Sequence, residues 1–256
     1  MLQAIFRFHG DLDYFLAPEQ RNGIVIYDFG QEPDGKIAVK HAVESLGIPH
    51  TEVDQITVNG GVVGFDYGLT SGDVIDVCAW IPKPDQGNLR PPLPRPVRFV
   101  LDTHLGRLAV YLRLLGFDAL YRNDYSDATL AALSHQEGRV LLTRDRGLLK
   151  RRIVEFGCCV RENDPKQQLI SLLRRYQLAA EIKPWQRCLR CNELLEPVDK
   201  AEILDQLEPK TKRYFNDFRR CEGCRQIYWP GSHYDRMQAF IGQVFEEALR
   251  QTSSQE

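Results

Sequence analysis

The pattern of apolar and polar residues along the chain changes near residue 81. Before that point, AIFRFHG and GIVIYDFG alternate apolar and polar residues and therefore predict two β-strands. The next segment has helical spacing, with a broad apolar face formed by Ile37, Val39, Val43, Leu46 and Ile48. Two more short strands, QITVNG and DVIDVCAW, follow, and Asn59-Gly60-Gly61 predicts a tight turn after the first of them. We expect one helix packed on a mixed sheet.

A proline-rich stretch interrupts this pattern over residues 81–98. The sequence IPKPDQGNLRPPLPRPVR holds six prolines and no apolar periodicity. Because proline fixes φ and removes a hydrogen-bond donor, this stretch predicts an extended, semi-rigid linker. We therefore expect an α+β domain at 1–81 and a linker at 82–97.

Strands and helices alternate after the linker. RFVLD, FDALYR and RVLLT predict buried strands, and HLGRLAVYLRLLG and SDATLAALSHQEG predict helices that end near Gly116 and Gly138. A weaker strand, CCVRE, and a helix, DPKQQLISLLRRYQL, complete the run. Strands joined by helices of this length imply right-handed crossovers and a parallel sheet. The fold class expected for 98–180 is therefore α/β.

Acidic residues follow the predicted strands of this sheet. Asp102 follows FVL, Asp145 follows VLLT and one arginine, and Asp124 and Asp127 both follow the middle strand. Ligands of open parallel sheets bind outside the carboxyl ends of the strands, so we expect these carboxylates to face one cleft. Such carboxylates repel each other unless a cation neutralises them, and Mg²⁺ or Mn²⁺ suits their oxygen ligands. A structural interpretation stays open, because Asp102 and Asp145 also suit helix N-caps and Asp124 suits a turn.

The balance of charge differs between the two parts of the chain. The net charge is −2, yet residues 1–81 hold four basic and twelve acidic side chains, and the remainder holds 29 basic and 23 acidic ones. The second part therefore suits a polyanion, with ordinary variation between domains as the alternative. The arginines expected around the acids, as candidates for binding phosphate, are Arg107, Arg113, Arg144 and Arg146. Carboxylates that hold a metal, with cations around them, fit hydrolysis of RNA or single-stranded DNA.

Four of the seven cysteines form two Cys-x-x-Cys pairs. Cys188 pairs with Cys191 and Cys221 with Cys224, and 29 residues separate the two pairs. Each pair can present two thiolates on a tight turn, and two such turns close a tetrahedron around Zn²⁺. A closed site of four cysteines is structural, since it leaves no open position for catalysis. We expect a zinc ribbon with a C-terminal helix at 181–256.

The sequence resembles two known families. ITVNGGVVGFDYGLTSGDVIDV is similar to the last hairpin and strand of the β-grasp, ubiquitin-like sulfur carriers of thiamine and molybdopterin synthesis. Those carriers end in Gly-Gly, whereas Gly60-Gly61 is internal here, so the resemblance implies a docking module for a protein partner and not a sulfur carrier. Through LDTHLGRLAVYLRLLGFD, SDATL and GRVLLTRDRGLL, residues 98–155 resemble the Mut-7 C-terminal RNase family, a branch of the PIN-like nucleases.

The second resemblance implies a PIN-like fold and roles for particular residues. It assigns the catalytic, metal-binding acids to Asp102, Asp127 and Asp145, with Asp124 as the alternative middle acid. The sequence TRD, in the same resemblance, implies a place near the metal for Thr143 or for the arginine that follows it.

The cysteine segment resembles the tail of the same family. RCLRCNELLEPVDKAEI and CEGCRQIYWPGSHYDRM look like its zinc ribbon, and GSHYDRM is similar to its closing motif. His233 in that motif is therefore a candidate for contact with substrate phosphate, while its spacing alone favours a packing role. Tyr228, Trp229 and Tyr234 can stack on bases or pack the ribbon.

Two functions are expected from these patterns. The first is a Mg²⁺- or Mn²⁺-dependent ribonuclease with a structural zinc ion and an N-terminal protein-interaction module. The alternative is a non-catalytic RNA-binding or ribosome-associated adaptor whose acidic site is degenerate. The sequence shows no run of eighteen apolar residues and no secretory signal, so we expect no membrane partner and a cytoplasmic location.

Overall fold

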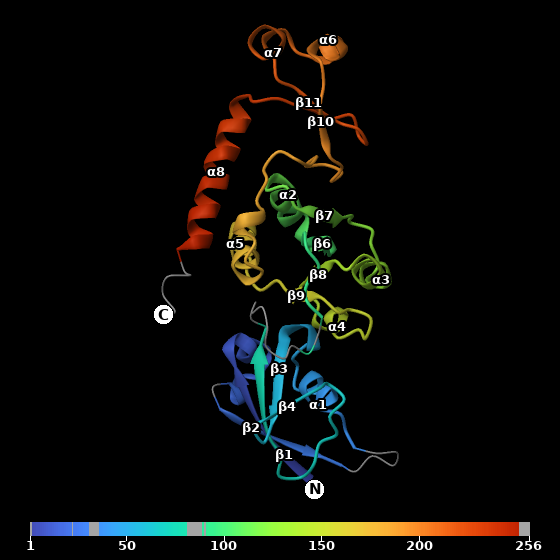
Figure 1. Ribbon diagram of the computed structural model, residues 1–256, viewed down its shortest axis with the longest axis vertical. Helices are drawn as coiled ribbons and strands as arrows, with labels where there is room; N and C mark the ends of the chain where they lie inside the picture. Colours follow the sequence, from blue (N-terminus) through green and yellow to red (C-terminus); the bar gives the residue numbers. More distant parts are fainter. Residues whose placement is uncertain (1, 22, 31–35, 81–88, 90, 251–256) are drawn as a thin grey trace. The chain divides into compact units, whose positions relative to one another are not determined.

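The computed structural model describes residues 2–21, 23–30, 36–80, 89 and 91–250 (Figure 1). These residues form two compact units, each built from two stretches of the chain. The first unit comprises Met1–Arg95 and Tyr125–Val160, and the second comprises Pro96–Asp124 and Arg161–Glu256. Residues 82–88 and 90 of the expected linker at 82–97 lie outside the described residues, and the domain boundaries derived from the sequence stay a prediction.

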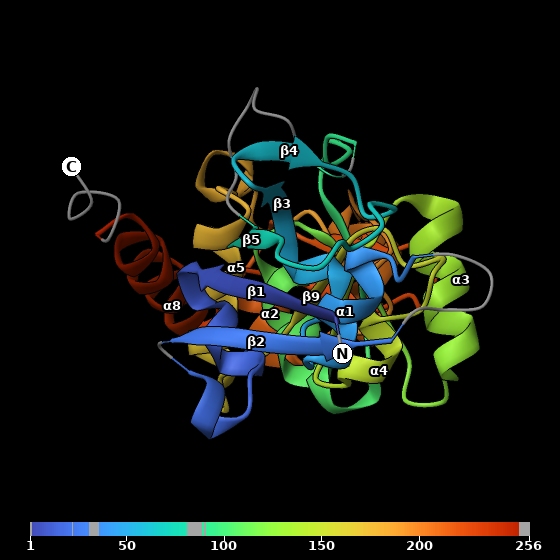
Figure 2. The same cartoon turned by 90° about the horizontal axis from the view of Figure 1, so that it is seen from below.

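A five-stranded mixed sheet forms the N-terminal part of the first unit. Its strand order is β2-β1-β5-β3-β4 (Figure 2). β1 (Leu2–His9) pairs antiparallel with β2 (Ile24–Phe29) and parallel with the central β5 (Val74–Ala79). β3 (Val53–Val58) pairs antiparallel with β5 and with β4 (Gly61–Val63) at the edge. The mixed sheet expected from the alternating apolar positions is therefore present.

One α-helix accompanies this sheet in the described part of residues 1–80. α1 (Val39–Ser45) contributes Val39, Ala42 and Val43, all fully buried, to a core that also holds Phe6 of β1. Three short 3-10 helices connect the elements: η1 (Gly10–Phe15), η2 (Pro18–Gln20) and η3 (His50–Glu52). This arrangement of one helix and a mixed sheet is the β-grasp architecture.

The turn between β3 and β4 follows the expectation from Asn59 and Gly60. Both residues have positive φ, 51° and 85°, as a two-residue type I′ hairpin turn requires. The Asn59 amide also donates to Asp73 Oδ1 at 3.0 Å, and its Oδ1 accepts from the amide of Val74 at 3.0 Å. Gly61 opens β4, so the Gly-Gly pair belongs to a fixed internal hairpin.

The remainder of the first unit alternates helices and strands. α3 (Asp127–Glu137) precedes β8 (Val140–Thr143), and α4 (Arg146–Leu149) precedes β9 (Gly157–Cys159). β8 and β9 are parallel. Gly138 ends α3 in the left-handed conformation, with φ of 60°, as its position after the apolar pattern indicates.

The second unit contains the other strands and helices of this alternating pattern. β6 (Arg98–Leu101) and β7 (Asp118–Tyr121) are parallel, and α2 (Gly106–Leu114) lies between them in the chain after the 3-10 helix η4 (Thr103–Leu105). α5 (Pro165–Arg175) follows the last strand. These parallel pairs with intervening helices confirm the α/β class expected for this part of the chain.

A small antiparallel sheet with order β10-β11-β12 follows in the second unit. Its strands are β10 (Leu195–Pro197), β11 (Arg219–Cys221) and β12 (Ile227–Tyr228). The insertion between β10 and β11 forms helices, α6 (Lys200–Ile203) with η6 (Leu204–Gln206) and α7 (Pro209–Tyr214). Ile203, Leu207, Phe218 and Ile227 give this ribbon an apolar cluster of its own.

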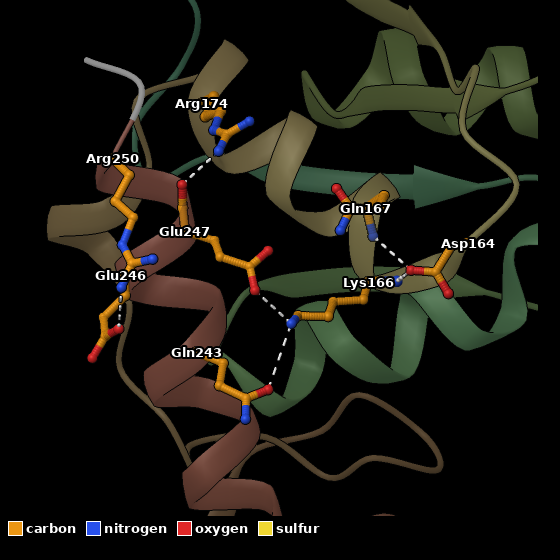
Figure 3. Close-up of polar contacts among 8 residues, drawn as sticks. All are labelled: Asp164, Lys166, Gln167, Arg174, Gln243, Glu246, Glu247 and Arg250. Atoms are coloured by element: carbon orange, nitrogen blue, oxygen red, sulfur yellow. Dashed lines mark hydrogen bonds and ion pairs between the residues drawn. The ribbon is translucent and has the colours of Figure 1, made fainter. Parts of the chain in front are cut away.

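The last helix, α8 (Ser232–Leu249), packs along α5 (Figure 3). Lys166 Nζ of α5 donates to Glu247 Oε1 at 2.6 Å and to Gln243 Oε1 at 3.5 Å. Arg174 donates to the Glu247 carbonyl at 2.5 Å. Within the described ranges, no helix combines the length and the apolar character needed to cross a membrane.

Candidate functional sites: a four-cysteine centre and a set of carboxylates

The two Cys-x-x-Cys pairs form one centre in the ribbon. All four Sγ atoms lie within 4.8 Å of one another, with 3.5 Å between Cys188 and Cys224 and 3.3 Å between Cys191 and Cys221. Tetrahedral Zn²⁺ with bonds of about 2.3 Å places sulfurs about 3.8 Å apart, so four thiolates of this arrangement fit zinc. Among the described residues, this is the one group of three or more Cys, His, Asp or Glu with ligand atoms so close.

The local sequence explains why the two pairs have the same shape. In each, the amide of the residue after the second cysteine donates to the carbonyl of the first: Asn192 to Cys188 at 3.0 Å, and Arg225 to Cys221 at 2.9 Å. Asn192 and Arg225 both have positive φ, 77° and 60°, which turns the chain back into a hairpin. Each turn therefore points its two sulfurs to the same side.

The surroundings of the four sulfurs favour ionisation of the Cys188 thiol at a lower pH than that of the Cys191 and Cys221 thiols. Burial raises the pKa of the Cys188 thiol, but hydrogen bonds from the Tyr228 hydroxyl and from backbone amides outweigh this and lower the pKa to about 6. Burial and the neighbouring sulfurs raise the pKa of Cys191 to about 12, and burial raises the pKa of Cys221. A divalent cation at the centre would favour the thiolate form of all four.

Arg113 supports this centre from α2 and differs from its expected role in substrate binding. Its side chain is only 3% exposed. Nη1 donates to the carbonyls of Leu189 and Arg190 inside the first turn, at 3.2 and 3.0 Å, and Nε donates to Ala119 O of β7 at 2.9 Å. Burial lowers the pKa of Arg113, while nearby Cys191 and Cys188 raise it. A buried guanidinium engaged in this way is not available to phosphate.

Asp102 lies where β6 ends, as the sequence predicts. It is the N-cap of η4, and its Oδ1 accepts from the Thr103 amide at 2.6 Å and from the Thr103 hydroxyl at 3.0 Å. The carboxylate is half-buried. The capping role that we kept as the alternative to metal binding is therefore observed here.

Asp145 follows β8 and is the N-cap of α4. Its Oδ1 accepts from the amides of Gly147 and Leu148 at 2.7 and 3.3 Å. The fully buried Thr143 accepts from the Asp145 amide at 2.9 Å through Oγ1. Thr143 therefore fixes the backbone of Asp145, and a buried hydroxyl of this kind is not exposed to substrate. Asp145 itself is exposed, and both cap bonds fall on the same oxygen.

The two candidates for the middle acid have different surroundings. Ser126, not Asp127, is the N-cap of α3, so Asp127 is the first helical residue and is exposed. Arg151 lies 3.4 Å from Asp127 Oδ2. Asp124 accepts two hydrogen bonds from Arg122, at 2.9 and 2.7 Å, and these bonds lower its pKa. Asp124 is thus satisfied by its own neighbour.

The four acids belong to different compact units. Asp102 and Asp124 lie in the second unit, and Asp127 and Asp145 lie in the first. Their common role in one metal site therefore stays a prediction from the position of each at the end of a strand or the start of a helix.

The remaining cationic candidates divide into two groups. Arg107 and Arg144 are exposed, as is His233 in the first turn of α8. Arg146 is half-buried and donates to the carbonyls of Phe15 and Tyr14, at 2.9 and 3.3 Å. Its guanidinium is therefore already bound within the first unit, which the sequence did not predict.

An aromatic cavity of about 660 Å³ lies beside the ribbon. The aromatic residues that line it are Trp185, Phe218, Tyr228, Trp229 and Tyr234. The Trp185 and Tyr234 rings stack with centroids 4.4 Å apart, and Arg219 and Asp217 add polar groups to the wall. Sequence reasoning considered three of these aromatic residues but missed Trp185 and Phe218, which lie outside the matched motifs.

Fold and sites together define an α/β protein with an N-terminal β-grasp domain and a cysteine ribbon. The family model described as the Mut7-C RNAse domain matches residues 97–241, which is more than half of the chain. The model described as Mut7-C ubiquitin matches residues 1–82. The chain therefore belongs to the Mut7-C RNase family and carries a ubiquitin-like domain at its N-terminus. Comparison with curated proteins and with solved structures gives no match.

Proposed function

We propose that this protein is a ribonuclease that depends on Mg²⁺ or Mn²⁺ and acts in the cytoplasm. The match to the Mut7-C RNAse domain over residues 97–241 carries the proposal. Asp102, Asp127 and Asp145 are the proposed metal ligands, with Asp124 as the less favoured middle acid because Arg122 already binds it. The ribbon is proposed to hold a structural Zn²⁺ through its four cysteines.

The donor chemistry of Asp145 supports a divalent cation. Its Oδ1 holds the first turn of α4, and the described residues give its Oδ2 no hydrogen bond. One carboxylate can therefore cap the helix with one oxygen and offer the other to a hard cation. When bound, Mg²⁺ or Mn²⁺ supplies Lewis acidity for hydrolysis of a phosphodiester.

The chain's own groups would bind and orient the RNA. The exposed guanidinium groups of Arg107 and Arg144 would attract backbone phosphates, and His233 would contact one more. The aromatic cavity beside the ribbon, with the exposed Trp229 at its wall, would accept unstacked bases, as single-stranded RNA offers them. Arg113, Arg146 and Thr143 are left out of this substrate-binding set because their polar groups are engaged inside the protein.

Cleavage of a labelled single-stranded RNA tests the proposal. We expect cleavage by the purified full chain on addition of Mg²⁺ or Mn²⁺, and loss of cleavage in the Asp102→Asn, Asp145→Asn double variant. Asparagine keeps the capping geometry, so the double variant should fold and bind RNA. Equal cleavage by the double variant would refute the proposed site.

An RNA-binding adaptor without catalysis is the second candidate. The observation that favours it is the capping role of both Asp102 and Asp145, which gives each acid a structural function without a metal. An adaptor would bind RNA in the absence of Mg²⁺ and leave it intact when Mg²⁺ is added.

A further inference from the structure

We infer that the ubiquitin-like domain docks on its own chain, on the segment that carries Asp145, and that Arg146 is a positioning residue for this carboxylate. The inference rests on the proposed function for the role of Asp145. All contacts that carry it lie inside the first compact unit, which joins the ubiquitin-like domain to residues 125–160. In Figure 1, α4 and β9 are drawn beside α1 and β3 of this unit.

Arg146, the residue after Asp145, is attached to the ubiquitin-like domain through its side chain. Nη1 donates to Phe15 O at 2.9 Å and Nη2 to Tyr14 O at 3.3 Å. The guanidinium also lies over the Tyr14 and Phe15 rings, 5.2 and 5.0 Å from their centroids. A planar fork that spans two carbonyls and stacks on rings is a use of arginine that lysine cannot reproduce.

The other end of α4 is attached to the same domain. Lys150 Nζ donates to the Glu44 carbonyl at the end of α1, at 2.5 Å. His50 Nε2 donates to Val154 O at 2.9 Å, and its Nδ1 lies 2.8 Å from Glu44 Oε1. The segment that follows α4 is therefore held through the Lys150 side chain and through the Val154 carbonyl.

A buried carboxylate completes the attachment at β9. Glu52 of η3 is fully buried, and its Oε1 accepts from the Cys159 amide at 2.6 Å. Gly157 allows this close approach, because an added Cβ would lie 2.6 Å from Leu149 Cδ2 and 3.3 Å from Thr51. A buried carboxylate is tolerated only where it is paired or hydrogen-bonded, so this contact is specific and not an incidental surface.

The size of α4 explains why these attachments concern Asp145. The helix has four residues, a single turn, and a helix this short is not stable by itself. Its conformation therefore depends on what it packs against. The amides of Gly147 and Leu148, which hold Asp145 Oδ1, belong to the turn that Arg146 attaches to the ubiquitin-like domain. Loosening Arg146 should let the carboxylate leave its position.

Mn²⁺ binding to the full chain, measured by titration calorimetry, tests the inference apart from catalysis. We expect Arg146→Ala to weaken Mn²⁺ binding by on the order of tenfold, the effect typical of groups that orient a metal ligand. Arg146→Lys should restore little of it. The matched control is Arg152→Ala, which removes the same charge from an exposed position of the same segment and should change the affinity less than about twofold.

The Asp145→Asn variant distinguishes failure of the proposed metal site from failure of the positioning role of Arg146. If Asp145→Asn leaves Mn²⁺ affinity unchanged, the proposed metal site is wrong. If it lowers the affinity while Arg146→Ala behaves like Arg152→Ala, the metal site stands and the positioning role is refuted. Tyr14→Leu covers the case in which Arg146→Ala does not fold. This variant removes one ring under the guanidinium and keeps the carbonyl, so it should weaken Mn²⁺ binding in the same direction but less; unchanged affinity would again overturn the role.

Discussion

The cysteine centre and the carboxylates are two candidate metal sites in one chain, built in different ways. Each pair of cysteines lies on one short turn whose backbone fixes the direction of its sulfurs, and the pairing of β10 with β11 brings the two turns together. Asp102 and Asp145, in contrast, already bind backbone amides as helix caps. Metal ligands with a characteristic local spacing can be identified from the sequence. An aspartate that caps a helix can also be a metal ligand, and only an experiment distinguishes these two roles.

The two sites should respond differently when their metal is removed. Without a metal, burial raises the pKa of Cys191 and of Cys221, so these two thiols resist ionisation. A capping aspartate keeps its hydrogen bonds whether or not a cation is present. We therefore expect the ribbon to depend on its metal for folding and the acids to depend on theirs only for activity.

Replacing two cysteines should have the largest effect. The Cys188→Ser, Cys221→Ser double variant should lose about one equivalent of zinc and unfold the ribbon, since structural zinc supplies folding energy. Metal analysis and hydrogen exchange over residues 186–230 measure this. Cys78→Ser, outside the cluster, is the control and should keep the zinc. Full zinc content in the double variant would contradict the assignment.

Asp145→Asn should have a large effect on cleavage and almost none on stability. Asparagine caps helices as well as aspartate does, so the free energy of unfolding should change by less than about 1 kcal/mol. Loss of the charge should lower the cleavage rate on the order of 100-fold or more. The control is Asp164→Asn, since Asp164 caps α5 with the same geometry, accepting from Lys166 and Gln167 at 3.0 Å. Equal loss of activity in both variants would show that only capping matters.

Arg113→Lys should have an intermediate effect on the ribbon. Lysine cannot reach the carbonyls of Leu189, Arg190 and Ala119 together, so buried acceptors lose their donors, at a cost of about 1–3 kcal/mol each. We expect a lower melting temperature and faster transfer of zinc to a chelator. Arg190→Lys, on the outside of the same turn, should change neither. If Arg113→Lys instead reduced RNA binding without changing stability, Arg113 would be a substrate-binding residue.

Glu247→Gln should have the smallest effect. The hydrogen bond from Lys166 lowers the pKa of Glu247 from its ordinary 4.5. A pKa lowered in the folded state means that this carboxylate contributes stability above pH 4.5 and that the contribution disappears as the pH falls through its folded pKa. The melting temperatures of variant and parent should therefore differ slightly at pH 7, and the difference should shrink as the pH falls below 4.5. Glu246→Gln, which removes only a contact within α8 to Arg250, is the comparison.

Local patterns in the sequence predicted most of the fold. Asn59 and Gly60 predicted the hairpin because the positive φ of its turn depends only on these two residues. Asp102 and Asp145 marked the ends of two strands because a helix cap involves only the few residues that follow it. The attachment of Arg146 to Phe15 and of Glu52 to Cys159 could not be predicted, since more than 100 residues separate the partners. The burial of Arg113 was not predicted either, since a charged residue is usually exposed and only the tertiary structure brings its guanidinium to the carbonyls of Leu189 and Arg190.

The ribbon also protects an exposed edge of the parallel sheet, at Ala119 on β7. β7 is an edge strand, and an edge normally exposes unpaired amides and carbonyls to other chains. Here the Ala119 amide donates to Asn192 Oδ1 at 2.9 Å, and its carbonyl accepts from Arg113. Asn192 of the cysteine ribbon and Arg113 of α2 thus cover this part of the edge with their side chains. Loss of zinc should therefore expose β7 as a template for strand addition and make the protein prone to aggregate.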